Sequence, residues 1–499
     1  MFSPREQASG SSTAVNHYNL LPSHGRDVSR SPSKWPSIRV SPRTRLRDIL
    51  LCLLPRRRRI IQFLLGLILL YVLFILRVHH WILSIHLEYP PLYEQYIENE
   101  LALPQHDPDL PFPEGREGRY LFVASHIEEY GWGNYMQELV LNAYLAHRSG
   151  RAFVFDNYTW NRHGPEYSVH FGKIIPSRIP LTALLAGPII GEPFPDGDSS
   201  PRAVHQTYFN EVCPNPTKLD GKEITDPYLW DSTDVLVEKL LEKFESVDDR
   251  CIEIVEGSGS LFPVVLFGSI NVLGTWPDLA QSPILTAFRW SHIVESGFSR
   301  NLPFIYTTTI TTRDAIPTYP YTTLPGLLVL QLRRGDYVRH CKRLFGWSAN
   351  WEAFNSFPQF PDQFDPEMDP DTGVAVSYDT YMKRCYPTPT QIAARVQEIL
   401  DTSAGNALDS VYIMTNGDEG FIEEVKDALK PLRKWNLVKS SRDLVVDHEQ
   451  RYIKQAIDML IGLRADVIIG NGWSSMSSNV AMLRMALLPD LSPDHTRYW

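Results

Sequence analysis

The chain has 499 residues, 43% hydrophobic and 21% charged, so it is long enough for more than one domain and too apolar for a disordered protein. Five cysteines are too few for a disulfide-rich scaffold of this length. The sequence contains no Cys-x-x-Cys pair, the pattern that would indicate a zinc ribbon. A net charge of −10 argues against nucleic acid as a main partner. The charge is uneven, however: residues 1–59 contain 12 Lys and Arg against three Asp and Glu, and the remainder contains 36 against 55.

An apolar run follows four arginines near the N-terminus. Residues 1–59, rich in Ser, Pro and Arg, predict a disordered cytoplasmic tail, and residues 60–77 predict a transmembrane anchor, because about 17–25 apolar residues span a bilayer. A cleaved signal peptide fits poorly, since its charged head is short. The positive-inside rule keeps the arginines at 56–59 cytoplasmic. We therefore expect a single-pass type II protein of the Golgi or endoplasmic reticulum membrane, with a Pro-containing stem over residues 78–116.

The cysteines agree with this topology. Cys52 lies on the cytoplasmic side of the expected anchor, and four others lie in the lumenal body: Cys213, Cys251, Cys341 and Cys385. Four cysteines allow three pairings, and the sequence leaves these and free buried thiols open. Asn157-Tyr158-Thr159 is a candidate N-glycosylation site.

Two regions of alternating strands and helices flank a long middle. Strands expected at 120–124 and 151–156 enclose an amphipathic helix, which predicts a βαβ unit and a parallel sheet. Further on, nearly all-apolar strands are expected at 327–332, 411–415 and 466–470, with helices at 418–429 and about 475–487. We predict an α/β fold of two Rossmann-like lobes facing a cleft, residues 117–322 and 323–499, with irregular insertions over 160–320.

Polar residues gather directly after these expected strands, where ligands bind in such folds. Arg333 follows the strand at 327–332, and a Gly/Ser-rich turn over 470–478 opens the last helix. Free backbone N–H groups at a helix start favour phosphate, and the planar guanidinium fork matches phosphate oxygens. We therefore expect a diphosphate between Arg333 and this turn. A second Gly-rich turn, residues 131–134, is expected to face the same cleft and to hold the acceptor or the reacting sugar.

Each of these signals also has an ordinary interpretation. Gly131-x-Gly133-Asn134 lacks the third glycine of a dinucleotide fingerprint and is typical of a tight turn. An arginine at a strand end is often an ion-pair partner, and a Ser-rich helix start is often an N-cap. Their joint order along the chain carries the functional prediction.

Three short blocks stand in an order that is found in one known family. They are Gly131-Trp132-Gly133-Asn134, Gln331 to Asp336, and Asp466 to Asn471 with Ser474 to Ser477. By these blocks the chain resembles the fucosyltransferase superfamily that uses GDP-fucose, and most closely its protein O-fucosyltransferase-like group, over roughly residues 118–490. The resemblance implies a GT-B fold and an inverting glycosyltransferase that needs no metal or other cofactor. It also implies GDP-fucose as donor and a protein or glycan hydroxyl as acceptor.

The resemblance implies roles for individual residues. Arg333 would bind the β-phosphate and stabilise the departing GDP, which agrees with the charge that develops there. Ser474, Ser475 and Ser477 would bind phosphate through hydroxyls and backbone N–H groups. Asn134 would lie near the sugar and the acceptor hydroxyl. The complete expected nucleotide-sugar site comprises Gly131, Gly133, Asn134, Arg333, Asp336, Asn416, Asp418, Ser474, Ser475 and Ser477.

The chain departs from the family pattern at two positions. Gln331 replaces the usual His, and Asn416 replaces an Asp that often reads the guanine edge, so Asp418 is expected to compensate. The base that deprotonates the acceptor is not evident. Glu129, with Glu128 beside it, is the candidate because both precede the Gly131 turn, although a surface role is the alternative for each.

Two other functions stay open at this point. A metal-dependent glycosyltransferase with another donor would use an Asp-x-Asp motif, and such spacings occur at 107–109, 196–198 and 369–371. A non-catalytic protein that binds a sugar nucleotide or glycan would explain Gln331 and Asn416.

Overall fold

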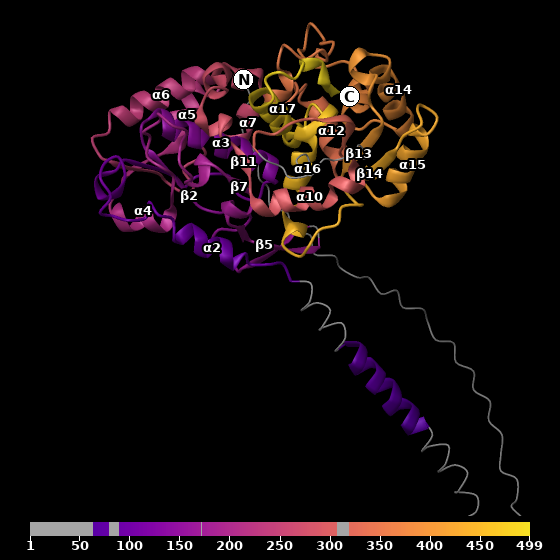
Figure 1. Ribbon diagram of the computed structural model, residues 1–499, viewed down its shortest axis with the longest axis horizontal. Helices are drawn as coiled ribbons and strands as arrows, with labels where there is room; N and C mark the ends of the chain where they lie inside the picture. The colour runs from indigo at the N-terminus through magenta and orange to yellow at the C-terminus, as the bar shows by residue number, and fades with distance from the viewer. Residues whose placement is uncertain (1–62, 79–88, 171, 307–318) are drawn as a thin grey trace, which may run out of the picture. The chain divides into compact units, whose positions relative to one another are not determined.

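A computed structural model describes residues 63–78, 89–170, 172–306 and 319–499 (Figure 1). It divides into two units, Met1–His86 and Leu87–Trp499. In the first unit, residues 63–78 form a helix whose apolar side chains from Phe63 to Leu76 are exposed. Within the described ranges, no helix combines the length and apolar character that a membrane span requires. Residues 60–62 of the expected anchor, the expected tail and Cys52 lie outside the described residues.

The first sheet of the unit Leu87–Trp499 is parallel, with the strand order β8-β2-β1-β10-β9. Its strands are β1 (Tyr120–Val123), β2 (Ala152–Phe155), β8 (Val204–His205), β9 (Thr217–Leu219) and β10 (Cys251–Ile254). The helices between them are α3 (Trp132–Arg148), α4 (Gln206–Val212), α5 (Gly221–Thr225) and α6 (Thr233–Glu245). The predicted βαβ unit is therefore confirmed, with α3 joining β1 to β2.

The second sheet is also parallel, with the order β14-β13-β12-β15-β16. Its strands are β12 (Leu324–Leu332), β13 (Ser410–Thr415), β14 (Leu437–Ser440), β15 (Ala465–Gly470) and β16 (Thr496–Tyr498). Its helices are α12 (Tyr337–Gly346), α13 (Tyr378–Cys385), α14 (Pro389–Leu400), α15 (Glu419–Leu429), α16 (Lys454–Arg464) and α17 (Ser475–Leu487). The predicted helices at 418–429 and 475–487 are confirmed, the first beginning one residue later because Asp418 is its N-cap.

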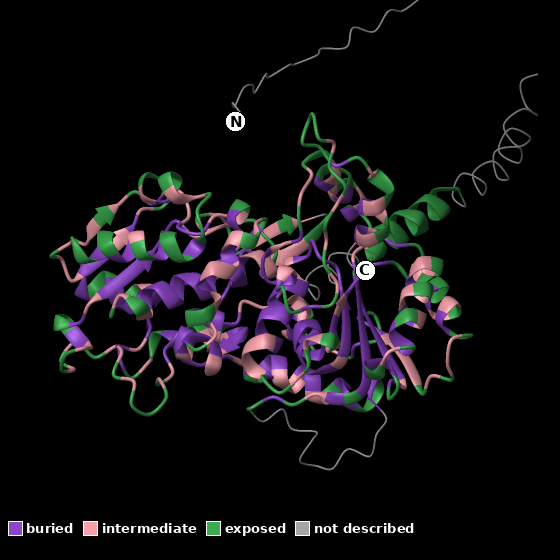
Figure 2. Cartoon of the chain, turned by 90° about the horizontal axis from the view of Figure 1, so that it is seen from above, coloured by how far each residue is buried: buried purple, intermediate pink, exposed green. Residues whose placement is uncertain are grey.

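The second sheet is covered on both faces, which explains its uninterrupted apolar strands. Alternate residues of β12 point to opposite sides. Leu328, Leu330 and Leu332 join one buried cluster with residues of α14 and α15, whereas Leu327 and Val329 join the other with residues of α16 and α17. Figure 2 shows these strands as buried and the exposed residues mainly on helices and loops. The mixed α/β fold with parallel sheets is therefore confirmed.

The middle of the chain holds shorter elements between the two sheets. Three two-stranded antiparallel pairs are described: β3 (Tyr158–Thr159) with β6 (Arg178–Ile179), β4 (Tyr167–His170) with β5 (Lys173–Pro176), and β7 (Leu185–Ala186) with β11 (Arg289–Trp290). The helices are α7 (Val264–Phe267), α8 (Trp276–Leu279), α9 (Pro283–Thr286) and α10 (His292–Ile305), with the 3₁₀ turn η5 (Ile270–Thr275) before α8.

Residues 89–116, predicted as part of a stem, are folded against the body. They include α2 (Glu94–Leu101). The Tyr93 hydroxyl donates to Glu449 O (2.8 Å), and Gln105 Nε2 donates to Gly191 O (2.9 Å). Glu100 is 1% exposed and accepts from the Thr182 backbone N–H (2.8 Å). Prolines suggested a linker, but these long-range contacts give the segment a defined position.

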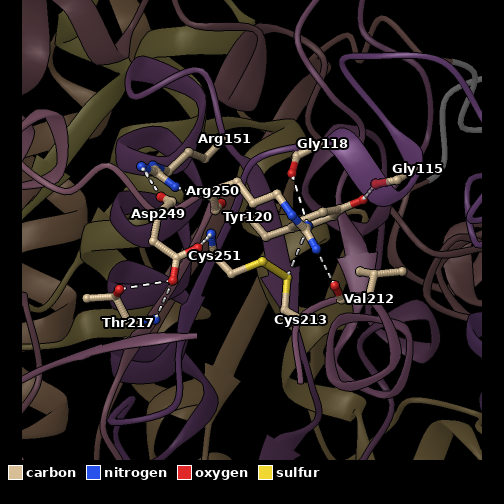
Figure 3. The surroundings of a disulfide bond; sticks show 10 residues. All are labelled: Gly115, Gly118, Tyr120, Arg151, Val212, Cys213, Thr217, Asp249, Arg250 and Cys251. Atoms are coloured by element: carbon tan, nitrogen blue, oxygen red, sulfur yellow. Dashed lines mark hydrogen bonds between the residues drawn. A yellow bond between two sulfur atoms is a disulfide. The ribbon is translucent and has the colours of Figure 1, made fainter. Parts of the chain in front are cut away.

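The four cysteines of the body form two disulfides, Cys213–Cys251 and Cys341–Cys385, which settles the pairing that the sequence left open. The first joins the end of α4 to the start of β10 (Figure 3). Beside it the Arg250 guanidinium donates to Val212 O and Gly118 O. The second joins α12, which begins shortly after Arg333, to α13.

Candidate active site

The order of the second sheet defines where a ligand would bind. The chain runs from β12 through β13 to β14 on one side and then crosses back to β15 on the other side of β12. In open parallel sheets, ligands bind beyond the carboxyl ends of the two strands at which the order reverses. Here those strands are β12 and β15. They end in Leu332 and Gly470, so Arg333 and the turn after Gly470 lie together at this point.

Arg333 carries a half-buried guanidinium that forms no hydrogen bond or ion pair with the residues that the structure describes. The side chain lies over the Tyr337 ring, 4.8 Å from the ring centroid. Its Nε atom is buried and makes no hydrogen bond, and no ion pair of Arg333 is found in the described part of the chain. An arginine used as a structural ion pair would have a carboxylate here. The arrangement instead leaves its donors available for an anion.

Gln331 explains how the turn after β15 is held. This residue is 1% exposed, and its Oε1 accepts from the Asn471 backbone N–H (3.2 Å) and from the Ser477 hydroxyl (3.2 Å). Its Nε2 donates to Ser474 Oγ (3.3 Å). The residue that replaces the family's His thus ties β12 to the turn that opens α17.

The serines of this turn therefore differ in availability. Ser474 and Ser477 are buried and their hydroxyls are engaged by Gln331, and Ser477 Oγ also accepts from Asn471 N (3.1 Å). The first backbone N–H groups of a helix have no intrahelical acceptor, and no side-chain cap binds those of α17. The groups free to bind an anion are thus these N–H groups and the half-exposed Ser475, rather than the hydroxyls of Ser474 and Ser477.

The segment at 131–134 is helical rather than a separate turn. Gly131 is the N-cap of α3, and Trp132, Gly133 and Asn134 form its first turn. The tertiary reason lies on α17. A Cβ atom on Gly133 would lie 2.6 Å from Ser475 Oγ, and Asn479 Nδ2 donates to Gly133 O (2.8 Å). The predicted glycine block and the predicted serine block are therefore in direct contact, with the starts of α3 and α17 side by side.

Asn134 and Glu129 lie on the α3 side of this junction. Asn134 is half-exposed and its amide makes no hydrogen bond within the described residues. Glu129 is exposed and has a left-handed backbone, with φ 62°. Glu128 is committed elsewhere, because its carboxylate pairs with Arg162 Nε (2.8 Å).

The loop before Gly131 is held by buried charges that the sequence analysis did not identify. His126 Nε2 and Asp156 Oδ1 are 2.7 Å apart, and Arg162 donates to Ala124 O (2.7 Å). Burial opposes a charge on His126, but the Asp156 carboxylate raises its pKa overall. The only sequence signal is the position of these residues beyond β1 and β2. The network fixes the loop that carries Glu128 and Glu129.

Asn416, Asp418 and Asp336 have separate structural positions. The Asn416 amide accepts from Arg334 N (2.8 Å) and donates to Arg334 O (3.0 Å), so it fixes the backbone beside Arg333. Asp418 caps α15 by accepting from Phe421 N (2.9 Å). Asp336 is exposed at the start of α12, where it makes no side-chain cap.

Arg334 follows Arg333 at the end of β12 and packs beside the site. It is 5% exposed, and its guanidinium lies between the rings of Tyr386 and Phe421, 4.3 and 3.8 Å from their centroids. Burial lowers the pKa of Arg334 to about 10. The neighbouring Cys385 carbonyl accepts from Asn471 Nδ2 (2.8 Å), so the Cys341–Cys385 disulfide also reaches the turn after β15.

The Asp-x-Asp spacings do not converge on this site. Asp109 N donates to Asp107, Asp198 pairs with His147 (2.8 Å), and Asp369 accepts from Thr372. Across the described ranges, no group of three or more His, Cys, Asp or Glu residues is arranged to hold a metal ion.

Comparison with known proteins bears on this site. Residues 323–487, which include β12, α12, β15 and most of the turn contacts above, match the family described as GDP-fucose protein O-fucosyltransferase. The match confirms the predicted resemblance and the predicted enzyme class, a fucosyltransferase-like glycosyltransferase. A search of curated proteins finds no match.

Several solved structures resemble the chain at low identity. A crystal structure of POFUT1 in complex with GDP-fucose is 16% identical, covering 76% of this chain and 97% of that chain, with a TM-score of 0.45. A complex of POFUT1 with GDP is 15% identical, covering 76% and 98%, with a TM-score of 0.44. The apo form is 16% identical, covering 76% and 97%, with a TM-score of 0.44.

Proposed function

We propose that this chain, a fucosyltransferase-like glycosyltransferase by its match over residues 323–487, transfers fucose from GDP-fucose to a hydroxyl of a protein or glycan. The observation that carries the proposal is the unpartnered Arg333 guanidinium beyond β12, beside the uncapped start of α17. A cation and a set of free N–H groups at one strand-order reversal suit a diphosphate.

The same groups suit the chemistry of transfer. When the bond between fucose C1 and the β-phosphate oxygen breaks, its electron pair leaves with GDP and negative charge grows on that oxygen. Arg333 and the α17 N–H groups would stabilise this charge where it develops, which lowers the barrier rather than only tightening binding. Metal assistance is not part of the proposal.

We assign the acceptor to the α3 side of the junction. Asn134 lies in the first turn of the helix that touches the α17 turn, and its amide, which makes no hydrogen bond within the described residues, supports a role near the sugar or the acceptor hydroxyl. In this proposal the two lobes form a GT-B arrangement, residues 117–322 on the acceptor side and 323–499 on the donor side.

We also propose that residues 60–77 anchor the protein in the Golgi or endoplasmic reticulum membrane, with the body in the lumen. The exposed apolar side chains of the helix at 63–78 support this, because a helix that is apolar all round needs an apolar environment. The two disulfides of the body agree with an oxidising compartment.

The test is a titration of the full-length chain in detergent with GDP-fucose, GDP-mannose, UDP-sugars and CMP-sugars, with and without EDTA. We expect GDP-fucose to bind most tightly and EDTA to have no effect. Charge-assisted hydrogen bonds contribute about 1.5–3 kcal/mol each, so Arg333→Ala should weaken binding by about ten- to a hundredfold. Arg339→Ala, on the exposed face of α12, is the matched control.

Each other outcome has a defined meaning. Preference for a UDP-sugar, or dependence on a divalent metal, would contradict the proposed donor. Equal losses in Arg333→Ala and Arg339→Ala would mean that the general positive charge of this region, and not a built site, attracts the nucleotide.

A further inference from the structure

We propose that Glu352 is the general base that takes the proton from the acceptor hydroxyl. The proposal rests on the proposed fucosyl transfer and supplies the residue that the sequence left unassigned. Glu352 lies outside all three family-like blocks. Its position follows from contacts with the turn between β15 and α17.

Glu352 and Arg333 are connected to neighbouring carbonyls of this turn. The Glu352 backbone N–H donates to Gly472 O (2.8 Å). The Tyr337 hydroxyl donates to the next carbonyl, Trp473 O (2.6 Å), and the Tyr337 ring lies against the Arg333 guanidinium. The Glu352 backbone and the Tyr337 side chain that lies against Arg333 therefore both bind the short stretch of backbone that precedes α17.

The segment that carries Glu352 is firmly held. Trp351 is 2% exposed and packs so closely on Gly472 that a Cβ atom there would lie 2.3 Å from the indole. Asn355 Nδ2 donates to the same Gly472 carbonyl (2.8 Å). Ala353, which begins the 3₁₀ turn η6 (Ala353–Ser356), has φ 43°, a left-handed conformation that non-glycine residues adopt rarely and often near functional sites.

The Glu352 carboxyl has no hydrogen bond or ion pair in the described part of the chain, although the residue is only half-exposed. Burial alone raises its pKa to about 8. It also raises the pKa of Tyr337 more strongly than Asp336 does, although Asp336 is the sequence neighbour. The charges of Glu352 and Arg333 therefore act on the pKa of Tyr337 with opposite signs.

The surroundings contain few other groups that titrate. Arg333 and Asp336 act with Glu352 on the pKa of Tyr337. The His340 ring lies 4.9 Å from the Tyr337 ring, and burial lowers the pKa of His340. The elements packed on η6 are η5 and the first turns of α17, whose sequences there carry no charge. A carboxyl so placed keeps its proton at neutral pH and becomes a strong base once ionised.

In the proposed step, ionised Glu352 accepts the acceptor's hydroxyl proton. The freed electron pair on oxygen forms the bond to fucose C1, while the C1–O bond to the β-phosphate breaks and its electron pair leaves with GDP. Arg333 receives the growing charge. The Glu352 carboxylic acid then loses its proton to water, so one proton and one GDP are released for each fucose transferred.

Glu352→Gln in the full-length chain tests the proposal, with Glu367→Gln, exposed in a loop, as the control. With water as acceptor, GDP release from GDP-fucose is measured between pH 6 and 9. General-base catalysis is worth about 10²–10⁴-fold, so we expect kcat to fall at least a hundredfold in Glu352→Gln. The Kd for GDP-fucose at pH 7 should stay within about threefold, because protonated Glu352 and its Gln replacement are both uncharged. The rise of kcat with pH near pH 8 should disappear.

Calorimetry of GDP-fucose binding at pH 8 in two buffers gives a second readout that needs no turnover. A bound diphosphate near the carboxyl should draw a fraction of a proton onto Glu352 in the wild type and none in Glu352→Gln. Unchanged kcat, or equal proton uptake in both proteins, overturns the base assignment while GDP-fucose binding still stands. If kcat falls in Glu129→Gln but not in Glu352→Gln, the general base is Glu129. Failure of the wild type to bind GDP-fucose instead overturns the proposed function.

Discussion

Gly133 lies directly against Ser475, so that a Cβ atom on Gly133 would stand 2.6 Å from Ser475 Oγ and 3.0 Å from Met476 N. Two segments more than 300 residues apart in the chain thus meet at the starts of their helices. Because α3 follows the first sheet and α17 follows the second, this contact sets the spacing between the expected acceptor and donor residues.

Gly133→Ala should disturb this contact. Overpacking of a close contact costs about 1–3 kcal/mol, so we expect a Tm lower by a few degrees. Since Ser475 begins α17, we also expect weaker GDP-fucose binding. Differential scanning calorimetry and titration calorimetry measure the two effects.

Gly131→Ala is the matched control. Gly131 has φ −64°, and nothing lies within 4 Å of a Cβ atom built on it. Its Tm should stay near that of the wild type. Equal effects of the two substitutions would show that the flexibility of the loop, rather than the contact with Ser475, matters.

Gln331→Leu should release the turn after β15. The variant removes the acceptor of the Asn471 and Ser477 hydrogens and the donor to Ser474, all of which are buried. Each buried polar group left without a partner costs about 1–3 kcal/mol. We expect a clear loss of stability in urea and at least tenfold weaker binding of GDP.

Gln397→Leu, on the outer part of α14, separates this effect from a general loss of a glutamine. The Gln397 Nε2 atom donates to Asp401 at the end of the same helix (2.8 Å), which is an exposed contact, so we expect little change. If Gln331→Leu binds GDP like the wild type, Gln331 holds the fold but not the donor site.

Most of the second sheet could be predicted from the sequence because its signals are local. Continuous apolar runs marked β12, β13 and β15, and Asp418 and the Ser-rich stretch at 475 marked helix starts within one residue. The order of the three blocks was likewise enough to predict the family resemblance, which the match over 323–487 confirms.

The remaining features depend on contacts between distant residues. The local sequence around Gly133 gives no sign of its contact with Asn479, which is 346 positions away. The first turn of α3 was therefore interpreted as a separate Gly-rich turn. The prolines of residues 89–116 indicated a linker, and the local sequence did not show that Glu100 is buried. The local sequence does not show the disulfide pairing either. Nor does it show that the hydroxyls of Ser474 and Ser477 form hydrogen bonds with Gln331.

The two disulfides should differ in their effect on function. They close loops of 38 and 44 residues, so the chain-entropy relation gives each about 4 kcal/mol of stability. Only Cys341–Cys385 touches the site, through the hydrogen bond from Asn471 to the Cys385 carbonyl. We expect both paired Cys→Ala variants to lose similar stability, and the variant at 341 and 385 alone to bind GDP-fucose at least tenfold more weakly at 15 °C. Equal affinities in the two folded variants would contradict a role for this bridge in the site.

Glu100 should make the packing of residues 89–116 depend on pH. Burial raises the pKa of this carboxyl to about 7, although hydrogen bonds from Thr182 partly offset the rise. The folded state therefore favours the protonated form. The stabilisation is complete below the ordinary value of 4.5 and is lost as the pH rises through 7, a change of about 3 kcal/mol at 1.36 kcal/mol per pKa unit.

Glu100→Gln keeps an acceptor for Thr182 but cannot ionise. The stability of this variant relative to the wild type should therefore rise by about 3 kcal/mol between pH 4.5 and pH 8, measured by urea unfolding at each pH. Other buried carboxyls, such as Asp458 with its pKa raised by burial to about 6, titrate in both proteins and cancel in the difference. Glu98→Gln, exposed on the same helix, should track the wild type at every pH. If Glu100→Gln also runs parallel to the wild type, Glu100 is hydrated in solution, and α2 is then a loosely attached part of a stem rather than a packed element of the body.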